Sequence, residues 1–423
     1  MCLECSPRFC SKEPLLSVHV CSGPSNVPPQ LSRTGSFGPQ AAAAMEFKRE
    51  RRFTYHRAGK EKVHTVRVKS TECHMTEHQS QVGRMQRTRV VVIGAGVIGL
   101  STALCIQNNI PGTSVTVIAD RFIQDTLSFG AAGFFRPDEN IGPTLDITRE
   151  WFRATFRHYE ILLHGNTAET AGIKRLSGYA LSSSNPEKLV NGTMKEFCAG
   201  LRPVDEQELR NFPLKYKYGI FYNSILADPR KYLKWLTDKI LCNGGHIKNQ
   251  VVKDLQDLKD FSVVVNCSGL RAKELTEDPL LTPVRGQVIK VFAPWVTQFY
   301  YADGCYILPG TEYVTLGGTK QLGDWNMEVS QHDRDYIWNT CTAVLPSLKD
   351  AKVIEDWVGL RPFRQPIRIE AEVLGSGSNQ CKVVHNYGHG AHGINTSWGT
   401  ALHATRLVSD MLQDETASML AKL

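Results

Sequence analysis

A run of apolar residues followed by glycines begins the most regular part of the chain. Residues 89–93 are an arginine and four branched apolar residues, a pattern typical of a buried parallel strand. Residues 94–99 carry three glycines with the G-x-G-x-x-G spacing, and the positions after them predict a helix over 97–108. A second strand is predicted over 114–119 and ends at Asp120. The pattern therefore predicts a βαβ unit of the kind that binds dinucleotides.

Later segments extend this α/β pattern. Apolar periodicity predicts helices over 151–163, 229–241 and 394–412, and residues 261–269 predict another strand of the same buried sheet. Between residues 283 and 320, β-rich runs are separated by glycine and proline, which predicts an antiparallel sheet in a second domain. We therefore expect an α/β fold, with a Rossmann-like nucleotide-binding domain and a second α+β domain built on a mixed or antiparallel sheet.

The first 86 residues show no such pattern. They mix proline, serine, a run of alanines and a basic stretch, which predicts disorder or a segment outside the folded protein. They carry 13 Lys and Arg against 7 Asp and Glu, so that of the net charge of +7 only +1 remains for residues 87–423. Nucleic-acid binding therefore has no electrostatic support in the folded part. Because Met85 stands just before the first strand, we predict that translation begins there or that the extension is dispensable.

Neither a membrane anchor nor a metal site is predicted. The apolar run from Val90 to Ile106 is short for a membrane span and contains three glycines, so a buried strand and helix explain it better. Cys2, Cys5 and Cys10 have no histidine nearby at ligand spacing. The other cysteines are dispersed through a long chain, which fits a reducing compartment.

The glycines of the first turn have separate roles in dinucleotide binding. Gly94 permits the tight bend, Gly96 lets the backbone approach a pyrophosphate, and Gly99 lets the helix pack close to the strand. The helix N-terminus then offers N–H groups and a partial positive charge to the phosphates. Asp120 lies 26 residues after Gly94, near the usual spacing of a carboxylate that binds the adenosine ribose. The alternative is a tight turn without a ligand.

A second glycine-rich segment, residues 385–395, precedes the last predicted helix. A cofactor held by the backbone at both ends of the folded unit is long and buried, which favours FAD over an exchangeable nicotinamide; an NAD-linked dehydrogenase is the alternative. His385, His389 and His392 lie in this segment without an accompanying carboxylate. We interpret them as turn residues rather than metal ligands.

Arg361 lies between Leu360 and Pro362, in apolar surroundings where a guanidinium needs an anionic partner. A substrate carboxylate fits its planar fork, and an internal salt bridge is the alternative. Tyr306 has a hydroxyl that suits the same carboxylate, and a core tyrosine is the alternative. The chain contains neither a G-x-S-x-G nor an H-E-x-x-H motif, so hydrolysis has no support.

From about Met85 to the C-terminus, the chain resembles the D-amino-acid oxidase family of flavoproteins, most closely its D-aspartate oxidase branch. The resemblance is carried by VVIGAGVIGLS (91–101), AAG (131–133), VRGQV (284–288), APW (293–295), YILPGT (306–311), VTLGGTKQLGDWN (314–326), GLRPFR (359–364) and NYGHG (386–390). It implies tightly bound FAD and a substrate domain whose sheet faces the flavin ring. The cofactor-binding residues that it implies, together with those of the first turn, are Gly94, Ala95, Gly96, Val97, Ile98, Gly99, Asp120, Arg121, Ser128, Ala131, Ala132, Gly133, Val252, Gly390, His392, Gly393, Ile394 and Asn395.

The resemblance also implies the catalytic and substrate-binding residues. It assigns Arg361 and Tyr306 to the substrate α-carboxylate. D-aspartate oxidases carry a cation at the position of Lys320, which favours an acidic substrate, whereas a surface lysine is the alternative. The segment before Tyr306 is short and lacks an arginine of those relatives, so that Arg136 and His392 are candidates to supply the missing positive charge.

The implied activity is FAD-dependent oxidative deamination of D-amino acids, chiefly D-aspartate and D-glutamate. Hydride transfer to flavin N5 gives, after hydrolysis, a 2-oxo acid and ammonia, and oxygen as acceptor yields hydrogen peroxide. Positioning provides most of the catalysis, so no side-chain general base is required. Two alternatives stand: an oxidase of neutral D-amino acids, and a flavin-binding relative without turnover.

We expect three kinds of segment along the chain. FAD-binding parts are 87–150, 241–280 and 355–412, substrate-domain parts are 151–240 and 281–354, and the extension 1–86 and the tail 413–423 flank them. The last residues, Ala421-Lys422-Leu423, match the small-basic-leucine form of a peroxisomal address. They predict the peroxisomal matrix as the location and its import receptor as a partner.

Overall fold

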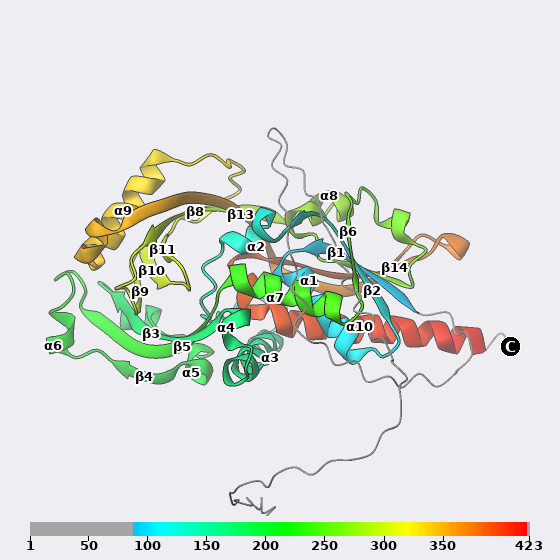
Figure 1. Ribbon diagram of the computed structural model, residues 1–423, viewed down its shortest axis with the longest axis horizontal. Helices are drawn as coiled ribbons and strands as arrows, with labels where there is room; N and C mark the ends of the chain where they lie inside the picture. The colour runs from blue at the N-terminus through cyan, green and yellow to red at the C-terminus, as the bar shows by residue number, and fades with distance from the viewer. Residues whose placement is uncertain (1–87, 421–423) are drawn as a thin grey trace, which may run out of the picture. The chain divides into compact units, whose positions relative to one another are not determined.

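The computed structural model describes residues 88–420 (Figure 1). The predictions for the extension, for its cysteines, for a start at Met85 and for the tripeptide 421–423 fall outside the described residues. Within residues 88–420, no helix is long and apolar enough to cross a membrane.

The described residues form one continuous sheet with helices packed on it. Its strand order is β4-β5-β3-β9-β10-β11-β8-β13-β14-β7-β1-β2-β6, and β12 pairs with β8 beside this path. The strands are β1 Arg89–Ala95, β2 Ser114–Phe122, β3 Ile173–Ser182, β4 Ala199–Pro203, β5 Tyr218–Ala227, β6 His246–Asn249, β7 Val263–Asn266, β8 Thr282–Phe292, β9 Phe299–Ala302, β10 Cys305–Pro309, β11 Val314–Gly317, β12 Gln321–Leu322, β13 Lys352–Leu374 and β14 Cys381–His389. The helices are α1 Val97–Asn109, α2 Leu127–Gly130, α3 Leu145–His164, α4 Ala168–Ala171, α5 Met194–Phe197, α6 Glu206–Leu209, α7 Pro229–Cys242, α8 Ala272–Thr276, α9 Gln331–Val344 and α10 Gly393–Leu420.

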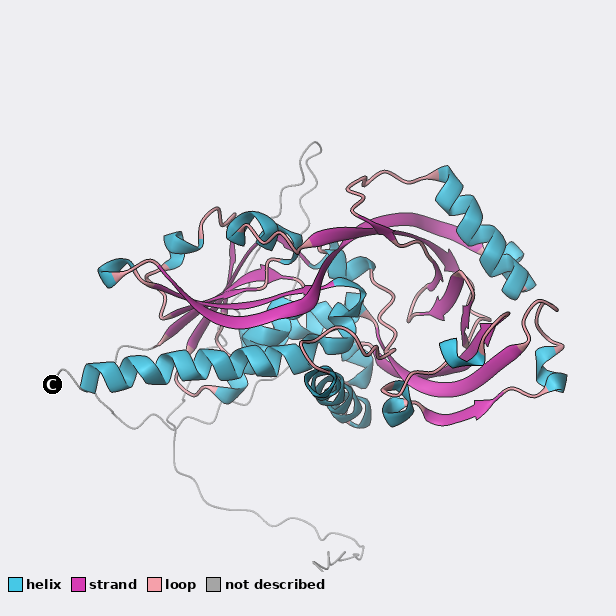
Figure 2. Cartoon of the chain, turned by 180° about the vertical axis from the view of Figure 1, so that it is seen from behind, coloured by secondary structure: helices cyan, strands magenta, loops and turns pink. Residues whose placement is uncertain are grey.

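The parallel half of the sheet is β14-β7-β1-β2-β6, as the βαβ pattern predicts. Its central strand β1 is buried on both faces because successive side chains point to opposite sides. Val90 and Val92 pack in the cluster that includes α1, α3, α7 and α10, while Val91 and Ile93 pack in a second cluster on the other face. Figure 2 shows α10 running along this half of the sheet.

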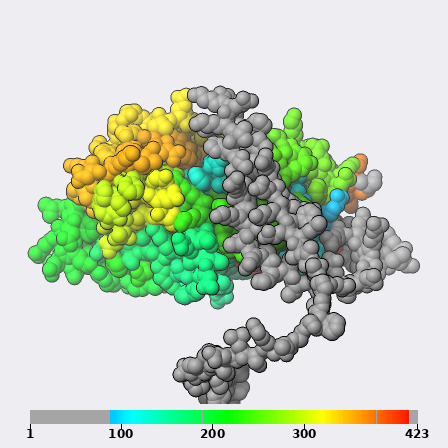
Figure 3. Space-filling model, in the orientation of Figure 1, coloured from blue at the N-terminus to red at the C-terminus, as the bar shows by residue number. Residues whose placement is uncertain are grey.

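The other half of the sheet is mainly antiparallel, as the β-rich runs after residue 283 predict. β8 pairs with β11 and β13, and β10 pairs with β9 and β11, all antiparallel. This half is nevertheless continuous with the parallel half, because the 23-residue β13 pairs first with β8 and then with β14. In Figure 3 the segments of the antiparallel half, green to orange, form one end of the described part. The domain boundaries proposed above stay a prediction.

The predicted helices are present, but some of their ends differ. The helix expected over 151–163 is α3, which begins at Leu145 because the side chain of Thr144 accepts a hydrogen bond from the N–H of Ile147 at 3.2 Å. α7 begins at Pro229, as predicted, after Asp228 caps it in the same way. The last helix is longer than predicted and extends to Leu420.

Candidate active site

A cavity of about 1390 Å³ is lined by residues from both halves of the sheet. It is bordered by the turn between β1 and α1, by the segment that leads into α10, and by residues of β8, β10 and β13. The structure thus brings together segments from opposite ends of the folded unit. Of the predicted site residues, the following line this cavity: Gly94, Ala95, Gly96, Val97, Ile98, Asp120, Arg121, Ser128, Ala131, Ala132, Gly133, Arg136, Tyr306, Lys320, Arg361, Gly390, His392, Gly393, Ile394 and Asn395.

The first glycine turn is too tight for side chains. Gly94 has φ +106°, and a Cβ there would lie 2.4 Å from the carbonyl oxygen of Cys267. A Cβ on Gly99 would lie 1.9 Å from the carbonyl oxygen of Gly94, so the glycine allows α1 to pack against the turn. Gly99 itself does not line the cavity. Gly96 is the N-cap of α1 and supplies no side-chain cap. The first N–H of the helix, that of Val97, donates to Oγ of Ser128 at 3.0 Å, and the partial positive charge of the helix start suits an anion.

The segment before α10 reaches the same place from the other end of the chain. Gly390 has φ +54°, and Gly393 is the first residue of α10. A Cβ on Gly393 would lie 3.8 Å from Cγ1 of Val97, the first residue of α1. The N-terminal ends of two helices therefore lie close together at the cavity, which is the arrangement that a diphosphate requires.

Asp120 and Val252 are both predicted to lie near the adenosine of the cofactor, but only Asp120 lines the cavity. Asp120 lines the cavity and forms an ion pair with Arg271 at 3.2 Å. Val252 does not line the cavity; its side chain packs in the apolar cluster with Val91 and Ile118. Its predicted contact is therefore limited to the backbone.

Tyr306 and Arg361 meet in a recess walled by glycines. Tyr306 lies on β10 opposite Gly317 of β11, where a Cβ would come 2.0 Å from the tyrosine ring. Arg361 lies on β13 opposite Val284 of β8, and its guanidinium reaches Gly286 of the same strand, where a Cβ would come 2.1 Å from Nη1. The glycines make the room in which both polar groups face the cavity.

Arg361 takes part in none of the ion pairs found among residues 88–420, which disfavours the internal salt bridge. Its Nη1 instead donates to the carbonyl oxygen of Thr319 at 3.2 Å. Burial raises the pKa of the Tyr306 hydroxyl above its ordinary value, although Arg361 opposes the shift. Tyr306 is therefore a neutral hydrogen-bond donor beside a cation, a pair that suits a carboxylate.

Two further cations face this recess. Lys320 lines the cavity but is itself exposed. Partial desolvation, Arg361 and Arg136 lower its pKa, whereas Asp138 opposes the shift. The guanidinium of Arg136 stacks over the ring of Tyr301 at 4.9 Å, and its buried Nε has no hydrogen-bond partner among the described residues. Among residues 88–420, Asp138 is the one carboxylate in these interactions, so a further anion would stabilise this group of cations.

His392 is not a third cation at neutral pH. Burial lowers its pKa to about 4, with Lys320 and Arg136 acting in the same direction, although Asp138 at 3.6 Å opposes the shift. The imidazole is therefore neutral at pH 7. Of the two candidates for the missing charge, Arg136 carries a charge at neutral pH, and its role in binding stays a prediction.

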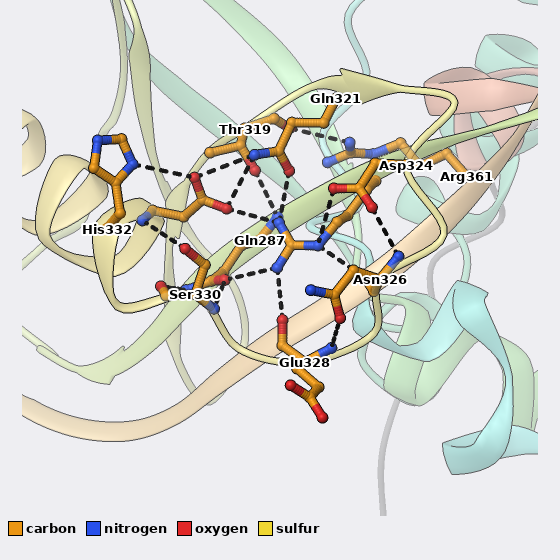
Figure 4. Close-up of polar contacts among 11 residues, drawn as sticks. Gln287, Thr319, Gln321, Asp324, Asn326, Glu328, Ser330, His332 and Arg361 are labelled. Atoms are coloured by element: carbon orange, nitrogen blue, oxygen red, sulfur yellow. Dashed lines mark hydrogen bonds and ion pairs between the residues drawn. The ribbon is translucent and has the colours of Figure 1, made fainter.

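A fully buried arginine, Arg285, binds Gln321 of β12 and residues of the loop after it. Figure 4 shows three of its partners, Gln321, Asn326 and Glu328. Its guanidinium donates to the side chains of Asp333 at 2.7 Å and Gln321 at 2.6 Å, and to the carbonyl oxygens of Asn326 at 2.8 Å and Glu328 at 2.7 Å. These bonds use the several donors of the guanidinium at once. They fix Gln321 of β12 and the loop after it, and Thr319 and Lys320 directly precede this strand.

Sequence reasoning did not assign Arg285, Thr319 or Gln321 to the site. Arg285 had a usable signal, because a charged residue inside an apolar strand requires partners. Thr319 had no such signal in the sequence. Its carbonyl oxygen accepts a hydrogen bond from Arg361, and its hydroxyl accepts one from the N–H of Gln287 at 2.9 Å. Both contacts join residues far apart in the chain.

The three histidines of the last glycine-rich segment have separate partners. Nε2 of His385 lies 2.9 Å from Glu372, and Nε2 of His389 lies 3.2 Å from the hydroxyl of Thr400. In the part of the chain that the structure describes, no three His, Cys, Asp or Glu side chains are grouped so that they could hold a metal.

Comparison with known proteins identifies this architecture. Residues 89–407 match the family model described as FAD dependent oxidoreductase. The chain belongs to this family. The resemblance to flavoprotein oxidases noted from the sequence is thereby confirmed, and FAD is the cofactor.

Curated relatives of this oxidoreductase match over nearly their whole length. Human D-aspartate oxidase is 42% identical over 330 residues, covering 77% of this chain and 96% of that protein. D-aspartate oxidase 1 of Caenorhabditis elegans is 34% identical, covering 77% and 98%. The D-amino acid oxidase of Dugesia ryukyuensis is 33% identical, covering 76% and 98%.

Solved structures show the same fold at lower identity. Glycine oxidase from Geobacillus kaustophilus superposes with a TM-score of 0.63 at 18% identity, covering 76% of this chain and 95% of that one. The FAD-bound L-alpha-glycerophosphate oxidase of Mycoplasma pneumoniae superposes with a TM-score of 0.60 at 15% identity, covering 77% and 95%. The α/β fold with a large mixed sheet is thus that of FAD oxidoreductases.

The residues present fit FAD. The cradle formed by Gly94, Gly96 and Gly390 has no room for side chains at its turns, and two helix N-termini adjoin it. The cavity continues from this cradle to Tyr306 and Arg361, so that a long cofactor and a small substrate have space in one enclosure.

Proposed function

We propose that this oxidoreductase deaminates D-amino acids oxidatively, with acidic ones preferred, and releases a 2-oxo acid, ammonia and hydrogen peroxide. The observation that carries the proposal is the recess of Tyr306 and Arg361, in which the guanidinium interacts with the Thr319 carbonyl and the Tyr306 hydroxyl but pairs with no carboxylate of residues 88–420. A carboxylate is the ligand that such a pair recognises. The relatives named for D-aspartate and D-amino acids support the substrate class.

The cofactor is held by the backbone of the two glycine segments. In this proposal, Gly94–Gly99 and the start of α1 bind the diphosphate, and Gly390–Asn395 approach from α10. Ser128 and the turn Ala131–Gly133 line the cavity between these segments, and Asp120 and Arg121 border its adenosine end. When bound, FAD supplies the two-electron acceptor whose reoxidation by dioxygen yields peroxide.

The chain's own contribution to the chemistry is positioning. Arg361 offers two parallel N–H groups to the α-carboxylate, and Tyr306 adds a hydroxyl donor that keeps its proton because burial raises its pKa. The bond from Arg361 to Thr319 fixes the plane of the guanidinium. A substrate pinned at its carboxylate can turn only about few axes, which selects the orientation of its Cα–H bond.

The acidic preference follows from the two remaining cations. Arg136 has a buried Nε without a partner among residues 88–420, and Lys320 lies in the field of both arginines. A second carboxylate on the substrate relieves this repulsion, whereas an apolar side chain does not. We assign Arg136 and Lys320 to the substrate side chain, and His392 to its neutral surroundings.

The test is anaerobic bleaching of the bound flavin by D-aspartate and D-alanine at equal concentration, with L-aspartate as the stereochemical control. Faster bleaching by D-aspartate supports the proposal. Arg136→Ala should reduce the preference for D-aspartate, whereas Arg406→Ala should leave it unchanged, because Arg406 is exposed and paired with Glu150 at 2.6 Å outside the cavity. Faster bleaching by D-alanine in the unaltered protein would instead make it an oxidase of neutral D-amino acids.

The location proposed for the enzyme is the peroxisomal matrix. The support is the tripeptide Ala421-Lys422-Leu423, which lies outside the described residues, together with a reaction that releases peroxide. The partner in this proposal is the peroxisomal import receptor. Deleting the tripeptide should leave a fluorescently tagged protein in the cytosol, and unchanged punctate fluorescence would refute the assignment.

A further inference from the structure

Two cysteines lie in contact directly beside the recess. Cys305 precedes Tyr306 on β10, and Cys341 lies on α9, which packs against that strand. Both belong to one apolar cluster, in which the two thiols interact with each other. Sγ of Cys341 also donates to the carbonyl oxygen of Tyr306 at 3.5 Å and lies 3.9 Å from that of Gly317. The thiols are thus in contact with the two strands that form the recess.

Only one of the two cysteines is reached from the cavity. Cys305 is 5% exposed and lines the cavity together with Gly304 and Tyr336. Cys341 is 0% exposed and does not line it. A small solute formed in the cavity therefore meets Cys305 first and Cys341 only through it.

The pKa values of the two thiols shift in opposite directions. The interaction with Cys341 lowers the pKa of the Cys305 thiol, with Thr340 and Lys215 acting in the same direction, although burial and Asp303 oppose the shift. The same contact and burial raise the pKa of Cys341. The thiolate is the form that reacts with peroxide. Because Cys305 lines the cavity and Cys341 does not, Cys305 is placed to attack first and Cys341 to follow.

We propose that Cys305 and Cys341 are a peroxide-reactive pair that closes to a disulfide and restrains Tyr306. The sulfur of Cys305 attacks one peroxide oxygen, the O–O bond breaks, and the leaving hydroxide takes a proton to become water. The sulfur of Cys341 then attacks the resulting sulfenic acid, the S–O bond breaks, and the hydroxyl leaves with the proton of Cys341 as a second water. Two thiols are oxidised by two electrons, and one peroxide is reduced to two waters.

In this proposal, the disulfide acts on the recess through the backbone of Tyr306. Closing the bond removes the S–H that Cys341 donates to the carbonyl of Tyr306 and ties α9 to β10 beside the substrate tyrosine. The oxidised enzyme therefore binds a substrate carboxylate more weakly, and its own product limits its turnover. This consequence rests on the proposed function, because only the oxidase reaction supplies peroxide inside the cavity.

The experiment begins with peroxide added to the purified holoenzyme without substrate. Free thiols are then alkylated, and a non-reducing digest is analysed by mass spectrometry. The expected result is loss of alkylation at Cys305 and Cys341 together, a cross-linked peptide two hydrogens lighter than its two parts, and reversal by dithiothreitol. Cys341→Ser should instead trap Cys305 as a sulfenic acid that reacts with dimedone. Cys242→Ser is the matched control, because Cys242 is exposed on α7 and should not affect the cross-link.

Two results overturn the proposal: alkylation of Cys305 that persists while the exposed Cys242 is oxidised, or a cross-link that joins other cysteines. A second arm replaces added peroxide with D-aspartate and air, with and without catalase. A cross-link with added peroxide but not with D-aspartate supports the pair and counts against the oxidase function.

The KM for D-aspartate should rise on oxidation in the unaltered enzyme and return with dithiothreitol. In Cys341→Ser it should stay constant, and an equal rise there would refute the restraint on Tyr306.

Discussion

Arg361 donates a hydrogen bond from Nη1 to the backbone carbonyl oxygen of Thr319 at 3.2 Å. The guanidinium is thus oriented by a neutral backbone group rather than by a carboxylate. Its positive charge remains available in a cavity that also contains Tyr306 and Lys320. This relationship explains how an arginine within a strand is kept in one orientation without an internal salt bridge, and it leads to the first prediction.

Replacing Arg361 should weaken substrate binding more than it weakens the fold. Arg361→Lys keeps the charge but loses the planar fork, and Arg361→Gln loses both. Because hydrogen bonds to charged groups contribute about 1.5–3 kcal/mol, we expect kcat/KM to fall about 10- to 100-fold in the lysine variant and further in the glutamine variant. Steady-state kinetics and flavin absorbance measure the two effects separately. Normal kcat/KM in both variants would remove Arg361 from the site.

The glycine wall should not tolerate a methyl group. A Cβ on Gly317 would lie 2.0 Å from the ring of Tyr306, so that Gly317→Ala must displace the tyrosine. We expect KM to rise and the free energy of unfolding to fall by about 1–3 kcal/mol, the usual cost of overpacking. Gly165→Ala is the matched control, because its nearest neighbour would lie 3.3 Å away on an exposed helix end. Equal KM values for the two variants would contradict the proposed contact.

Arg285 should matter for stability more than any exposed charge. Arg285→Met leaves the buried carboxylate of Asp333 without its cation, and breaking such a pair typically costs about 3–5 kcal/mol. Asp324→Asn provides the control, because Asp324 lies 3.9 Å from the same guanidinium with 40% of its side chain exposed. Denaturant unfolding followed by fluorescence measures both. A small effect of Arg285→Met would show that the loop after β12 is held by other contacts.

The stability of the protein should fall in mild acid because of buried histidines. His158 stacks on Trp398 at 3.6 Å, its Nε2 lies 2.9 Å from the hydroxyl of Tyr232, and burial lowers its pKa to about 3. The unfolded chain binds this proton near pH 6.5. The stability contributed by the neutral imidazole is therefore present above pH 6.5 and is lost progressively as the pH falls toward 3.

The change between pH 6.5 and pH 5 should be about 2 kcal/mol for His158 alone, from about 1.4 kcal/mol per pH unit. Burial also lowers the pKa of His389 to about 3, so this histidine adds to the loss of stability in acid. Urea unfolding at the two pH values measures the slope. His158→Gln removes one titrating group and should flatten the slope by this amount. An unaltered slope in the variant would mean that His158 is accessible to protons in the folded state.

Local patterns in the sequence were sufficient to predict the cofactor-binding unit. The strand, the three glycines and the helix that begins at Val97 depend on residues close together in the chain, so their spacing specifies the turn directly. The far glycine segment, Arg361 and Tyr306 were candidates from their residue types, and the resemblance to a family assigned the pair to the substrate α-carboxylate. The structure places both at the same cavity, whereas their roles in binding stay predictions.

The amino-acid sequence by itself determined the βαβ unit, most helices and the kind of cofactor, because these follow from periodicity and from glycines at fixed offsets. Only the tertiary structure decided that β13 joins both halves into one sheet, that Arg361 rests on Thr319, and that Cys305 touches Cys341. The neutral state of His392 also became visible only there, since its pKa depends on burial. Each of these features depends on contacts between distant segments, and such contacts leave no regular spacing along the chain.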